Sequence, residues 1–432
     1  MLATLRQRDF ALLWSGDVIS VVGDWVLIVG LPIYILILTH SVLATGGMMI
    51  AGRLPNILFG PLAGVFVDRW NRKRVIVVAD VLFALWLLPL LLVNSVDRVW
   101  IVYLVQVAES SIGQFFAPAE NALLPNLVSK EQLVAANSLN SLSDNLARLV
   151  GPALGGVVIG LAGLSGVVLV DTASFVIAGL LFVFIRVSPA AGRAGAAKTL
   201  GSAWAAFWRE WLDGLRLVRR ERVLFVFFLV ITITRLGEGV FGVLIIVFVN
   251  RVLHGGALQF GWLMSAQAIG ALIGSVIVGW AGSRLLSPRW IGLCSIIFGL
   301  IDLAIFNSPA FFPAFLVSFG LFVLVGVPGI AFATGLTALQ QAATPDAYRG
   351  RVSSTFLTTG ALMGLIGTII AGALGDHLGV VLVLNIQGGV YILAGVIVLA
   401  LLGGPLATRA ALAAGEKIGK PSRIEGAAES PS

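Results

Sequence analysis

Apolar stretches long enough to cross a lipid bilayer recur along the whole chain, and this feature limits most strongly what the chain can fold into. A bilayer core is crossed by ~20 residues of α-helix, and its interior tolerates only helices or closed barrels because backbone groups find no water there. The chain is 58% hydrophobic and only 11% charged, whereas soluble domains have about 25% charged residues. A soluble protein with a very large core would need a charged surface that this sequence lacks.

The apolar stretches predict an all-α membrane protein with twelve transmembrane helices in two six-helix, pseudo-symmetric halves. We expect an N-terminal half (1–186), a cytoplasmic linker with an amphipathic helix (187–222), a C-terminal half (223–404) and a disordered cytoplasmic tail (405–432). The predicted spans are residues 11–38, 42–67, 75–95, 99–118, 136–160, 166–186, 223–249, 257–282, 290–306, 311–333, 353–375 and 380–402.

The distribution of Lys and Arg predicts the orientation of these spans. With the N-terminus placed in the cytoplasm, the basic loops fall inside and only Arg98 and Arg251 fall outside. Cytoplasmic loops are enriched in Lys and Arg, so we expect a multi-pass protein of the cell membrane with both termini in the cytoplasm. The net charge of +7 is then a topology signal, and no loop has the basic face with interleaved aromatics that a nucleic-acid partner would need.

The linker contains the segment AWAAFWREWLDGLRLVRRERV, in which aromatic and aliphatic residues recur at helical spacing between charged ones. Such a segment predicts an amphipathic helix that lies on lipids of the cytoplasmic leaflet. A helix packed on the protein's own cytoplasmic face is an equally good interpretation of the same pattern.

No motif in the sequence predicts a metal, a cofactor or covalent catalysis. His40, His254 and His377 fall at three separate outer turns, and the single Cys294 lies within a predicted span. Phosphate-cradling loops, nucleophile elbows and dinucleotide fingerprints are lacking, so an enzyme of this sequence would have no visible nucleophile or metal set. The expected partners are a small-molecule substrate, protons and membrane lipids, and the chain is expected to act as a monomer.

The segment GVFVDRWNRKR (Gly64–Arg74) concentrates charge directly after the second span, and GWAGSRLLSPR (Gly279–Arg289) echoes it after the eighth. Two six-helix repeats are a known transporter plan. The first segment resembles the signature loop of the major facilitator superfamily, with Asn71 where a glycine is usual. The resemblance implies that Asp68 contacts neighbouring helix ends and stabilises the outward-open state, while a purely topogenic basic loop remains the alternative. The matching residues, expected to form a conformational gate, are Gly64, Asp68, Arg69, Arg72 and Lys73.

A second segment, ARLVGPALGG (Ala147–Gly156), resembles the antiporter motif that drug exporters of the superfamily carry in helix five. Small residues let helices approach closely, and a proline removes a backbone hydrogen bond and permits a kink. Ordinary glycine-mediated packing is the alternative interpretation. The chain as a whole resembles the macrolide-efflux and enterobactin-export branch, which favours export. The motif residues are Arg148, Gly151, Pro152, Gly155 and Gly156.

Charged residues at mid-depth of the spans are the candidates for coupling, because each costs about 2.5–3.5 kcal/mol to insert. Glu109 stands where many drug antiporters of the superfamily carry an arginine. Glu109 and Asp24 are the predicted proton carriers, followed by Glu238, which lies three residues from Arg235. The predicted cavity residues, on helices that line the cavity in the superfamily, are Asp17, Trp25, Gln106, Phe115 and Arg235.

Other intramembrane charges are interpreted as structural. Asp144 and Arg148 are four residues apart in the order that favours an ion pair. Asp171 and Asp302 lie on predicted helices six and nine, which the resemblance to the superfamily implies are packed outside the cavity.

The sequence therefore predicts a proton-coupled exporter of an amphipathic small molecule, of drug, macrolide or siderophore type, that works by alternating access. A flippase for lysolipids or similar substrates and a metabolite importer of the same fold are the alternatives.

Overall fold

The computed structural model describes residues 2–67, 69–186, 200–282, 287–312, 315–345 and 348–402, and all regular secondary structure within these ranges is helical. The all-α prediction is therefore confirmed for this part of the chain. Within these ranges, eleven helices are long and apolar enough to cross a membrane. The principal helices are α1 (Leu2–Leu5), α2 (Arg8–Thr39), α3 (Val42–Val67), α4 (Arg72–Leu87), α5 (Val99–Leu123), α6 (Leu133–Val183), α7 (Leu200–Arg220), α8 (Arg222–Arg251), α9 (Ala257–Ala281), α10 (Pro288–Asn307), α11 (Phe315–Ala343), α12 (Arg349–Leu378) and α13 (Val380–Leu402), with short 3₁₀ helices Leu88–Leu92, Val96–Arg98, Leu124–Asn126, Lys130–Gln132 and Ser308–Ala310.

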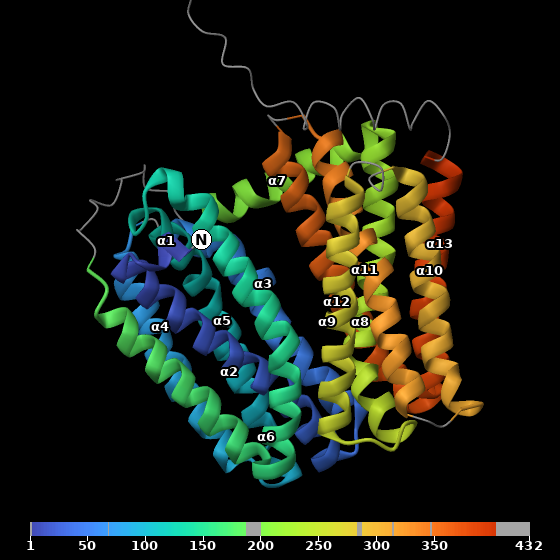
Figure 1. Cartoon of the computed structure of the whole chain (residues 1–432), viewed down its shortest axis with the longest axis horizontal. Helices are drawn as coiled ribbons and strands as arrows, with labels where there is room; N and C mark the ends of the chain where they lie inside the picture. The colour runs from blue at the N-terminus through green and yellow to red at the C-terminus, as the bar shows by residue number, and fades with distance from the viewer. Residues whose placement is uncertain are drawn as a thin grey trace, which may run out of the picture.

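Helix α6 covers two of the predicted spans. At 1.5 Å per residue its 51 residues would reach roughly 77 Å as one straight rod, more than twice the hydrocarbon thickness of a bilayer. The helical geometry is interrupted at Gly163, where φ is +61° and ψ is −162°. A positive φ is readily adopted by glycine because it has no Cβ. Figure 1 shows the chain reverse its direction in α6.

Local capping explains where several helices begin. The side chain of Asn71 accepts a hydrogen bond from the backbone N–H of Arg74 (3.1 Å), and Ser287 does the same for Trp290 (3.4 Å) at the start of α10. Both acceptors satisfy amide donors that a helix leaves unpaired in its first turn. At Asn71, where the superfamily usually has glycine, the side chain therefore serves as the cap of α4.

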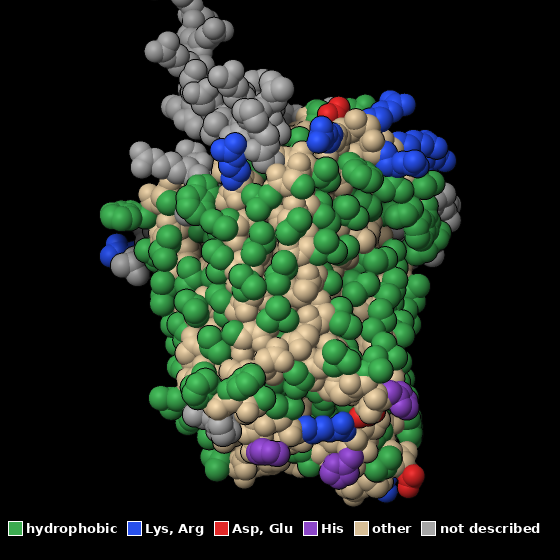
Figure 2. Space-filling model, turned by 90° about the vertical axis from the view of Figure 1, so that its right-hand side faces the viewer, with side chains coloured by type: hydrophobic (Ala, Val, Ile, Leu, Met, Phe, Trp, Pro, Cys, Tyr) green, Lys and Arg blue, Asp and Glu red, His purple; other side chains and the backbone are tan. Residues whose placement is uncertain are grey.

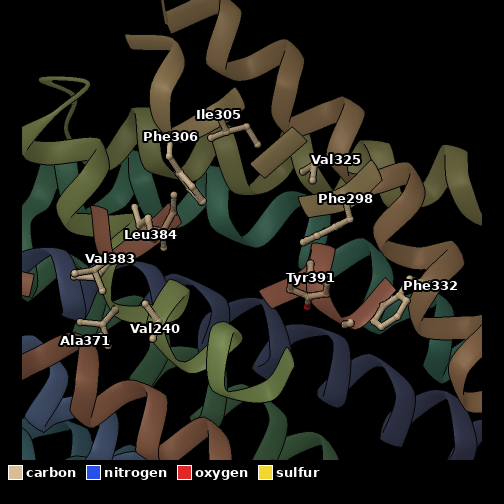
Figure 3. Close-up of a cluster of buried hydrophobic side chains, with 14 of the residues drawn as sticks. Val240, Phe298, Ile305, Phe306, Val325, Phe332, Ala371, Val383, Leu384 and Tyr391 are labelled. Atoms are coloured by element: carbon tan, nitrogen blue, oxygen red, sulfur yellow. The ribbon is translucent and has the colours of Figure 1, made fainter. Parts of the chain in front are cut away.

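The spanning helices form two groups (Figure 1): α2–α6, here the N-terminal group, and α8–α13, the C-terminal group. Each group has its own apolar core. In the C-terminal group, aromatic side chains such as Phe298, Phe306 and Tyr391 interlock with aliphatic ones from neighbouring helices (Figure 3). Phe83 and Phe175 stack in the N-terminal group, with ring centroids 4.7 Å apart.

The outer surface carries the apolar belt expected of a membrane protein. On the face of the C-terminal group, hydrophobic side chains cover the middle, and Lys, Arg and His gather toward the two ends (Figure 2). Large apolar side chains exposed on α10 and α13 include Leu300 and Leu393, each more than half exposed. Exposed apolar area of this extent is typical of lipid contact.

The two groups meet along two seams. At the first, a Cβ on Gly46 of α3 would lie 3.2 Å from the Cα of Gly372 on α12. At the second, a Cβ on Gly156 of α6 would lie 2.5 Å from the carbonyl oxygen of Ala257 in α9. Ser265 of α9 also donates to the carbonyl oxygen of Leu149 (2.6 Å). These approaches are close enough that a side chain at Gly156 would not fit without movement.

A polar network closes one end of the molecule, here the His40 end. Arg251 pairs with Asp376 (2.8 Å) and donates to the carbonyl oxygen of His40 (2.9 Å), so α8 and α12 are tied to the end of α2. Asp376 also accepts from the backbone N–H of Val42 (3.2 Å). The helix groups touch at this end and diverge toward α7 (Figure 1).

Helix α7 packs against the protein's own helices. The hydroxyl of Thr355 on α12 donates to the carbonyl oxygen of Trp211 (3.3 Å), and Val218 is fully buried. A Cβ on Gly214 would lie 2.8 Å from the carbonyl oxygen of Arg351. Of the two interpretations of this segment, the described residues therefore show contact with the protein. The predicted tail (405–432) and residues 187–199 of the predicted linker lie outside the described residues.

Candidate functional site

The two predicted proton carriers line a single pocket in the N-terminal group. Asp24 of α2 and Glu109 of α5 lie in a cavity of about 280 Å³, together with Gln106. A Cβ on Gly52 of α3 would lie 2.8 Å from the amide oxygen of Gln106, so α3 passes close to this wall. The remaining lining is apolar: Leu27, Ile28, Leu31, Pro32, Met48 and Met49.

More buried carboxylates surround this acidic pocket, as we call it. Asp17, Asp80 and Asp171 are 8%, 1% and 0% exposed. Asp171 accepts from Ser174 (3.4 Å), whereas neither carboxylate oxygen of Asp80 has a hydrogen-bond partner among the described residues. Asp80 was not among the predicted site residues. Its position as an acid inside the predicted apolar span 75–95 could have identified it. The N-terminal group thus concentrates acids that are not neutralised by cations.

The predicted ion pair between Asp144 and Arg148 is wrong. Both side chains are exposed, and no ion pair joins them in the structure. The guanidinium of Arg148 instead lies over the ring of Trp25 on α2, 6.0 Å from its centroid. A cation over an indole face is attracted by the ring quadrupole, and this contact draws Arg148 toward α2 and away from its neighbour on α6.

The glycines of the antiporter-like motif lie where α6 crosses two other helices. A Cβ on Gly151 would lie 2.8 Å from the Cγ of Trp25, and one on Gly155 would lie 3.1 Å from the Cα of Val26. Gly156 faces α9 in the other group. Helix α6 continues through Pro152, and its break is at Gly163. The motif therefore positions α6 simultaneously against α2 and against the C-terminal group.

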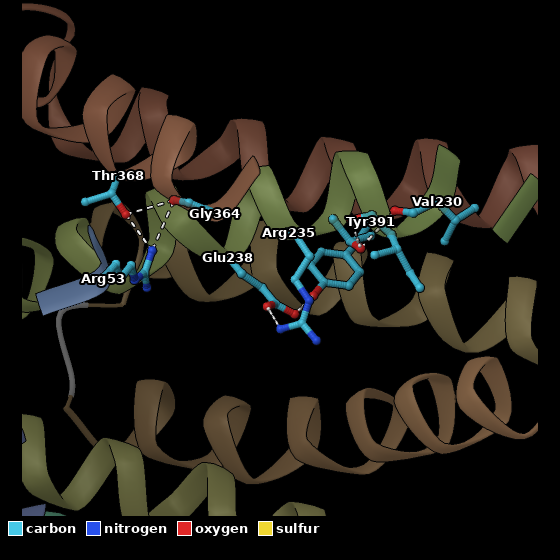
Figure 4. Close-up of polar contacts among 9 residues, drawn as sticks. Arg53, Val230, Arg235, Glu238, Gly364, Thr368 and Tyr391 are labelled. Atoms are coloured by element: carbon cyan, nitrogen blue, oxygen red, sulfur yellow. Dashed lines mark hydrogen bonds and ion pairs between the residues drawn. The ribbon is translucent and has the colours of Figure 1, made fainter. Parts of the chain in front are cut away.

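A second, larger cavity of about 530 Å³ lies between α3 and the C-terminal group. Arg235 and Glu238 of α8 form an ion pair there (2.7 Å), and the hydroxyl of Tyr391 donates to the other oxygen of Glu238 (3.1 Å). Arg53 of α3 reaches across from the N-terminal group and donates to the carbonyl oxygen of Gly364 (3.0 Å) on α12 (Figure 4). We call this the arginine pocket.

Arg53 was missed because the sequence reasoning confined cavity residues to helices one, four, seven and ten. Its charge inside the predicted span 42–67 was the available signal. Arg235 lines the arginine pocket as expected, but Asp17, Trp25 and Phe115 line neither pocket. Phe115 stacks on Trp70 instead, with ring centroids 6.0 Å apart.

The basic loop after α3 contacts the ends of other helices. Arg72 donates to the carbonyl oxygen of Ala122 (3.0 Å) near the end of α5, and Lys73 donates to that of Val183 (2.7 Å) at the end of α6. Cations are favoured there because the last carbonyls of a helix lack intrahelical partners and carry the negative end of its dipole. Asp68 lies outside the described residues, so its predicted role is untested.

Two pockets between packed apolar helices, and a basic loop that contacts helix ends, are typical of a multi-helix membrane carrier. The model of the transmembrane secretion effector family matches residues 1–424, and the chain belongs to this family of major facilitator superfamily transporters. The predicted superfamily is thereby confirmed.

Two efflux proteins are similar to this chain in sequence, and a solved transporter structure is similar to it in fold. Macrolide efflux protein A of Streptococcus pyogenes is 27% identical over 387 residues, which cover 87% of this chain and 91% of that protein. Enterobactin exporter EntS of Citrobacter koseri is 25% identical over 414 residues, covering 91% and 92%. A crystal structure of a bacterial homologue of the iron transporter ferroportin, in an inward-facing state, superposes with a TM-score of 0.73 at 19% identity and covers 91% of this chain and 98% of that one. The last likeness concerns the fold.

Proposed function

We propose that the protein is a secondary active exporter that moves an amphipathic small molecule out of the cytoplasm in exchange for protons. The observation that carries this proposal is the acidic pocket: Asp24 and Glu109, from two different helices, line one small cavity with apolar walls. Carboxylates that are neutral when protonated and charged when not can carry protons through such an environment. The names of the efflux relatives support the outward direction.

The proposed topology has twelve crossings, with six in each group. The interruption of α6 at Gly163 converts eleven apolar helices into twelve crossings, since its two parts lie in the predicted spans 136–160 and 166–186. We infer that both termini and α7 face the cytoplasm, because on the face drawn in Figure 2 the described Lys and Arg gather mainly at the α7 end. In this assignment the His40 end is external, and its closure corresponds to an inward-facing state.

In alternating access, the two groups rock about the seams while the pockets become accessible first from one side and then from the other. The polar network at the His40 end must break when the cavity opens outward. The basic loop and Asp68 at the opposite end are proposed to form contacts that hold the outward-open state.

Reconstituted protein tests the proposal. The protein is purified and reconstituted in liposomes, and a pH difference of one unit is imposed across the membrane. This difference should drive uphill accumulation of an amphipathic compound of siderophore type, and protein-free liposomes should show none. An ionophore that collapses the pH difference should abolish the accumulation. A carrier that moves the compound only downhill, whatever the pH difference, would not be a proton antiporter.

A further inference from the structure

We propose that the arginine pocket is an anion-binding subsite, which takes a carboxylate or another planar oxyanion group of an amphipathic organic substrate. The inference rests on the proposed transport function and names the chemical class of substrate that this function would serve. It stands on three features of the cavity: an arginine without a carboxylate partner, a second arginine that is only partly used, and a lining of amides and apolar side chains.

The first feature is Arg53. Its guanidinium donates to the hydroxyl of Thr368 (2.6 Å) and to the carbonyl oxygen of Gly364 (3.0 Å), both neutral acceptors. No carboxylate lies within ion-pair distance of Arg53 among the described residues. Arginine inside a membrane-spanning helix is rare and ordinarily pairs with an acid or marks a substrate path. The charge of Arg53 is therefore available to an anion from the cavity.

The second feature is the Arg235–Glu238 pair. Both oxygens of Glu238 are engaged, one by Arg235 (2.7 Å) and one by Tyr391 (3.1 Å). No ion pair joins Glu238 to Arg53 in the structure. The side chain of Arg235 remains 54% exposed, and its contact with Glu238 uses one of five N–H donors. Arg53, Arg235 and Glu238 together leave the pocket with a net charge of +1.

The two arginines face the cavity along one side of α12. A Cβ on Gly360 would lie 3.3 Å from the Cγ of Arg235, and one on Gly364 would lie 3.6 Å from a guanidinium nitrogen of Arg53. Gly360 and Gly364 are one helical turn apart, about 6 Å along the axis. Because neither glycine has a side chain, the guanidinium of Arg53 and the stem and Nε of Arg235 can lie close to this helix.

Both arginines line the cavity, so an oxyanion in it can reach a guanidinium group. The planar fork of a guanidinium binds carboxylate-like groups with two parallel hydrogen bonds, and such charge-assisted bonds are roughly twice as strong as neutral ones.

The third feature is the rest of the lining. Asn56, Gln340 and Gln341 offer amides, and Thr337 and Ser353 offer hydroxyls. Ile57, Ile231, Phe356 and Leu357 supply apolar wall. A cavity of about 530 Å³ is within the usual range for drug-sized ligands. The pocket therefore fits a molecule with one anionic head, further hydrogen-bonding groups and an apolar body, and it disfavours a cationic head.

Three fluorescent probes that differ only in their head group test the proposal: pyrenebutyrate (anionic), pyrenebutanol (neutral) and pyrenebutylamine (cationic). Binding is measured on the purified full-length protein in a neutral detergent, after subtraction of empty micelles. The wild type should bind pyrenebutyrate at least about tenfold more tightly than pyrenebutanol, the size expected for a hydrogen bond to a charged group. Pyrenebutylamine should bind most weakly.

Arg53→Gln should weaken pyrenebutyrate about tenfold or more and change pyrenebutanol by less than twofold. Arg53→Lys, which keeps the charge but not the fork, should recover part of the loss. Arg98→Gln removes an exposed arginine outside the pocket and should change nothing. Thr368→Val removes a neutral acceptor of Arg53 and should leave the preference for the anion intact.

The competing role for Arg53 is a latch between the two helix groups. A latch predicts that Arg53→Gln weakens all three probes equally, and this result would overturn the proposal. A wild type that binds none of the probes, or shows no preference for the anion, would overturn it as well. Should Arg53→Gln prove unstable, the double variant Arg235→Gln/Glu238→Gln removes the neighbouring pair as a unit, and it should lower the preference for the anion at least threefold while neutral binding persists.

Failure of this inference is distinguishable from failure of the proposed function. If proton-driven export is observed without any anion preference, only the subsite is refuted. If the anion preference is found but no uphill export occurs, the subsite stands and the export mechanism falls.

Discussion

The interiors of the two helix groups treat charge in opposite ways. In the N-terminal group, Asp24 and Glu109 share a pocket without a cation, and Asp80 is buried without any hydrogen bond among the described residues. In the C-terminal group, Asp302 accepts from Gln387 (3.0 Å) and Glu238 is held by two partners. Among the described residues, Asp24, Glu109 and Asp80 of the N-terminal group have no ion pair, whereas Asp302 and Glu238 of the C-terminal group are each held by a side-chain hydrogen bond or an ion pair.

This difference indicates a division of roles. A carboxylate that is enclosed by apolar walls and has no partner is costly to keep charged, so binding a proton stabilises it. A carboxylate that is held by an arginine is stabilised in its charged form instead. In the proposed mechanism, the N-terminal group would carry protons and the C-terminal group would hold substrate. Exchange would then require the seams to transmit movement between the groups.

The largest expected effect comes from neutralising the acidic pocket. A gradient of one pH unit can sustain about tenfold accumulation in a one-for-one exchange, since it corresponds to 1.36 kcal/mol. Glu109→Gln should reduce this accumulation to none while downhill exchange continues, because the amide cannot ionise. Asp24→Asn is the parallel variant, and both are measured in proteoliposomes.

Asp302→Asn is the matched control for these variants, because its amide oxygen can still accept from Gln387. It should accumulate substrate normally. If Glu109→Gln and Asp24→Asn both still respond to the gradient, the comparison between the interiors does not describe the proton path.

The second expected effect concerns the seam. Gly156→Val places a side chain where a Cβ already lies 2.5 Å from a backbone oxygen of α9, and overpacking costs about 1–3 kcal/mol. The closed His40 end should therefore open more often. The measurement is the maleimide labelling rate of Ser41→Cys in a Cys294→Ser background, which should rise about fivefold or more.

Gly160→Val is the control for this seam, because no atom lies within 4 Å of a Cβ at that position. Equal labelling rates in the two variants would mean that the contact between α6 and α9 does not hold the end closed.

A third effect, on stability, tests the contrast between hydrogen-bonded and unpartnered acids. Asp302→Ala leaves the amide donor of Gln387 buried without its partner, and the expected cost is about 1–3 kcal/mol. Asp80→Ala orphans no donor among the described residues and should cost less. Melting temperatures of the two purified variants compare them directly. A larger loss for Asp80→Ala would show that its carboxylate has a structural role.

The smallest effect is expected at the His40 end. The side chains of Arg251 and Asp376 are 38% and 35% exposed, and ion pairs of such exposure contribute roughly 0.2–1 kcal/mol. Asp376→Asn should therefore raise the Ser41→Cys labelling rate less than about fivefold, and high salt should reduce the difference from wild type. A tenfold change would mean that this pair, and not the glycine seam, keeps the end shut.

The helices were largely predictable from the sequence because bilayer thickness limits the length of an apolar helix. The predicted span 380–402 coincides with α13 (Val380–Leu402), and 290–306 falls within α10 (Pro288–Asn307). Helix α11 (Phe315–Ala343) continues ten residues beyond its predicted end at 333, because a helix can extend past its apolar part with polar residues such as Gln340.

Site residues were predictable only where the sequence of a single helix was enough to identify them. Asp24 and Glu109 were recognisable because each is a charge in an apolar span. Contacts between distant helices carried no such signal: Arg148 turns to Trp25 and not to Asp144, and Arg53 reaches a carbonyl more than three hundred residues away. Contacts of this kind depend on how helices that are distant in the sequence pack against one another.

The contacts of Arg72 and Lys73 with helix ends have a consequence for genetics. Their acceptors are carbonyl oxygens of the main chain at Ala122 and Val183, which every amino acid supplies. A substitution at Ala122 or Val183 leaves the main-chain carbonyl acceptor in place. Such a substitution therefore cannot restore the contact that is lost when Arg72 or Lys73 is replaced. A selection for second-site suppressors of Arg72 or Lys73 variants should therefore recover changes elsewhere in the chain.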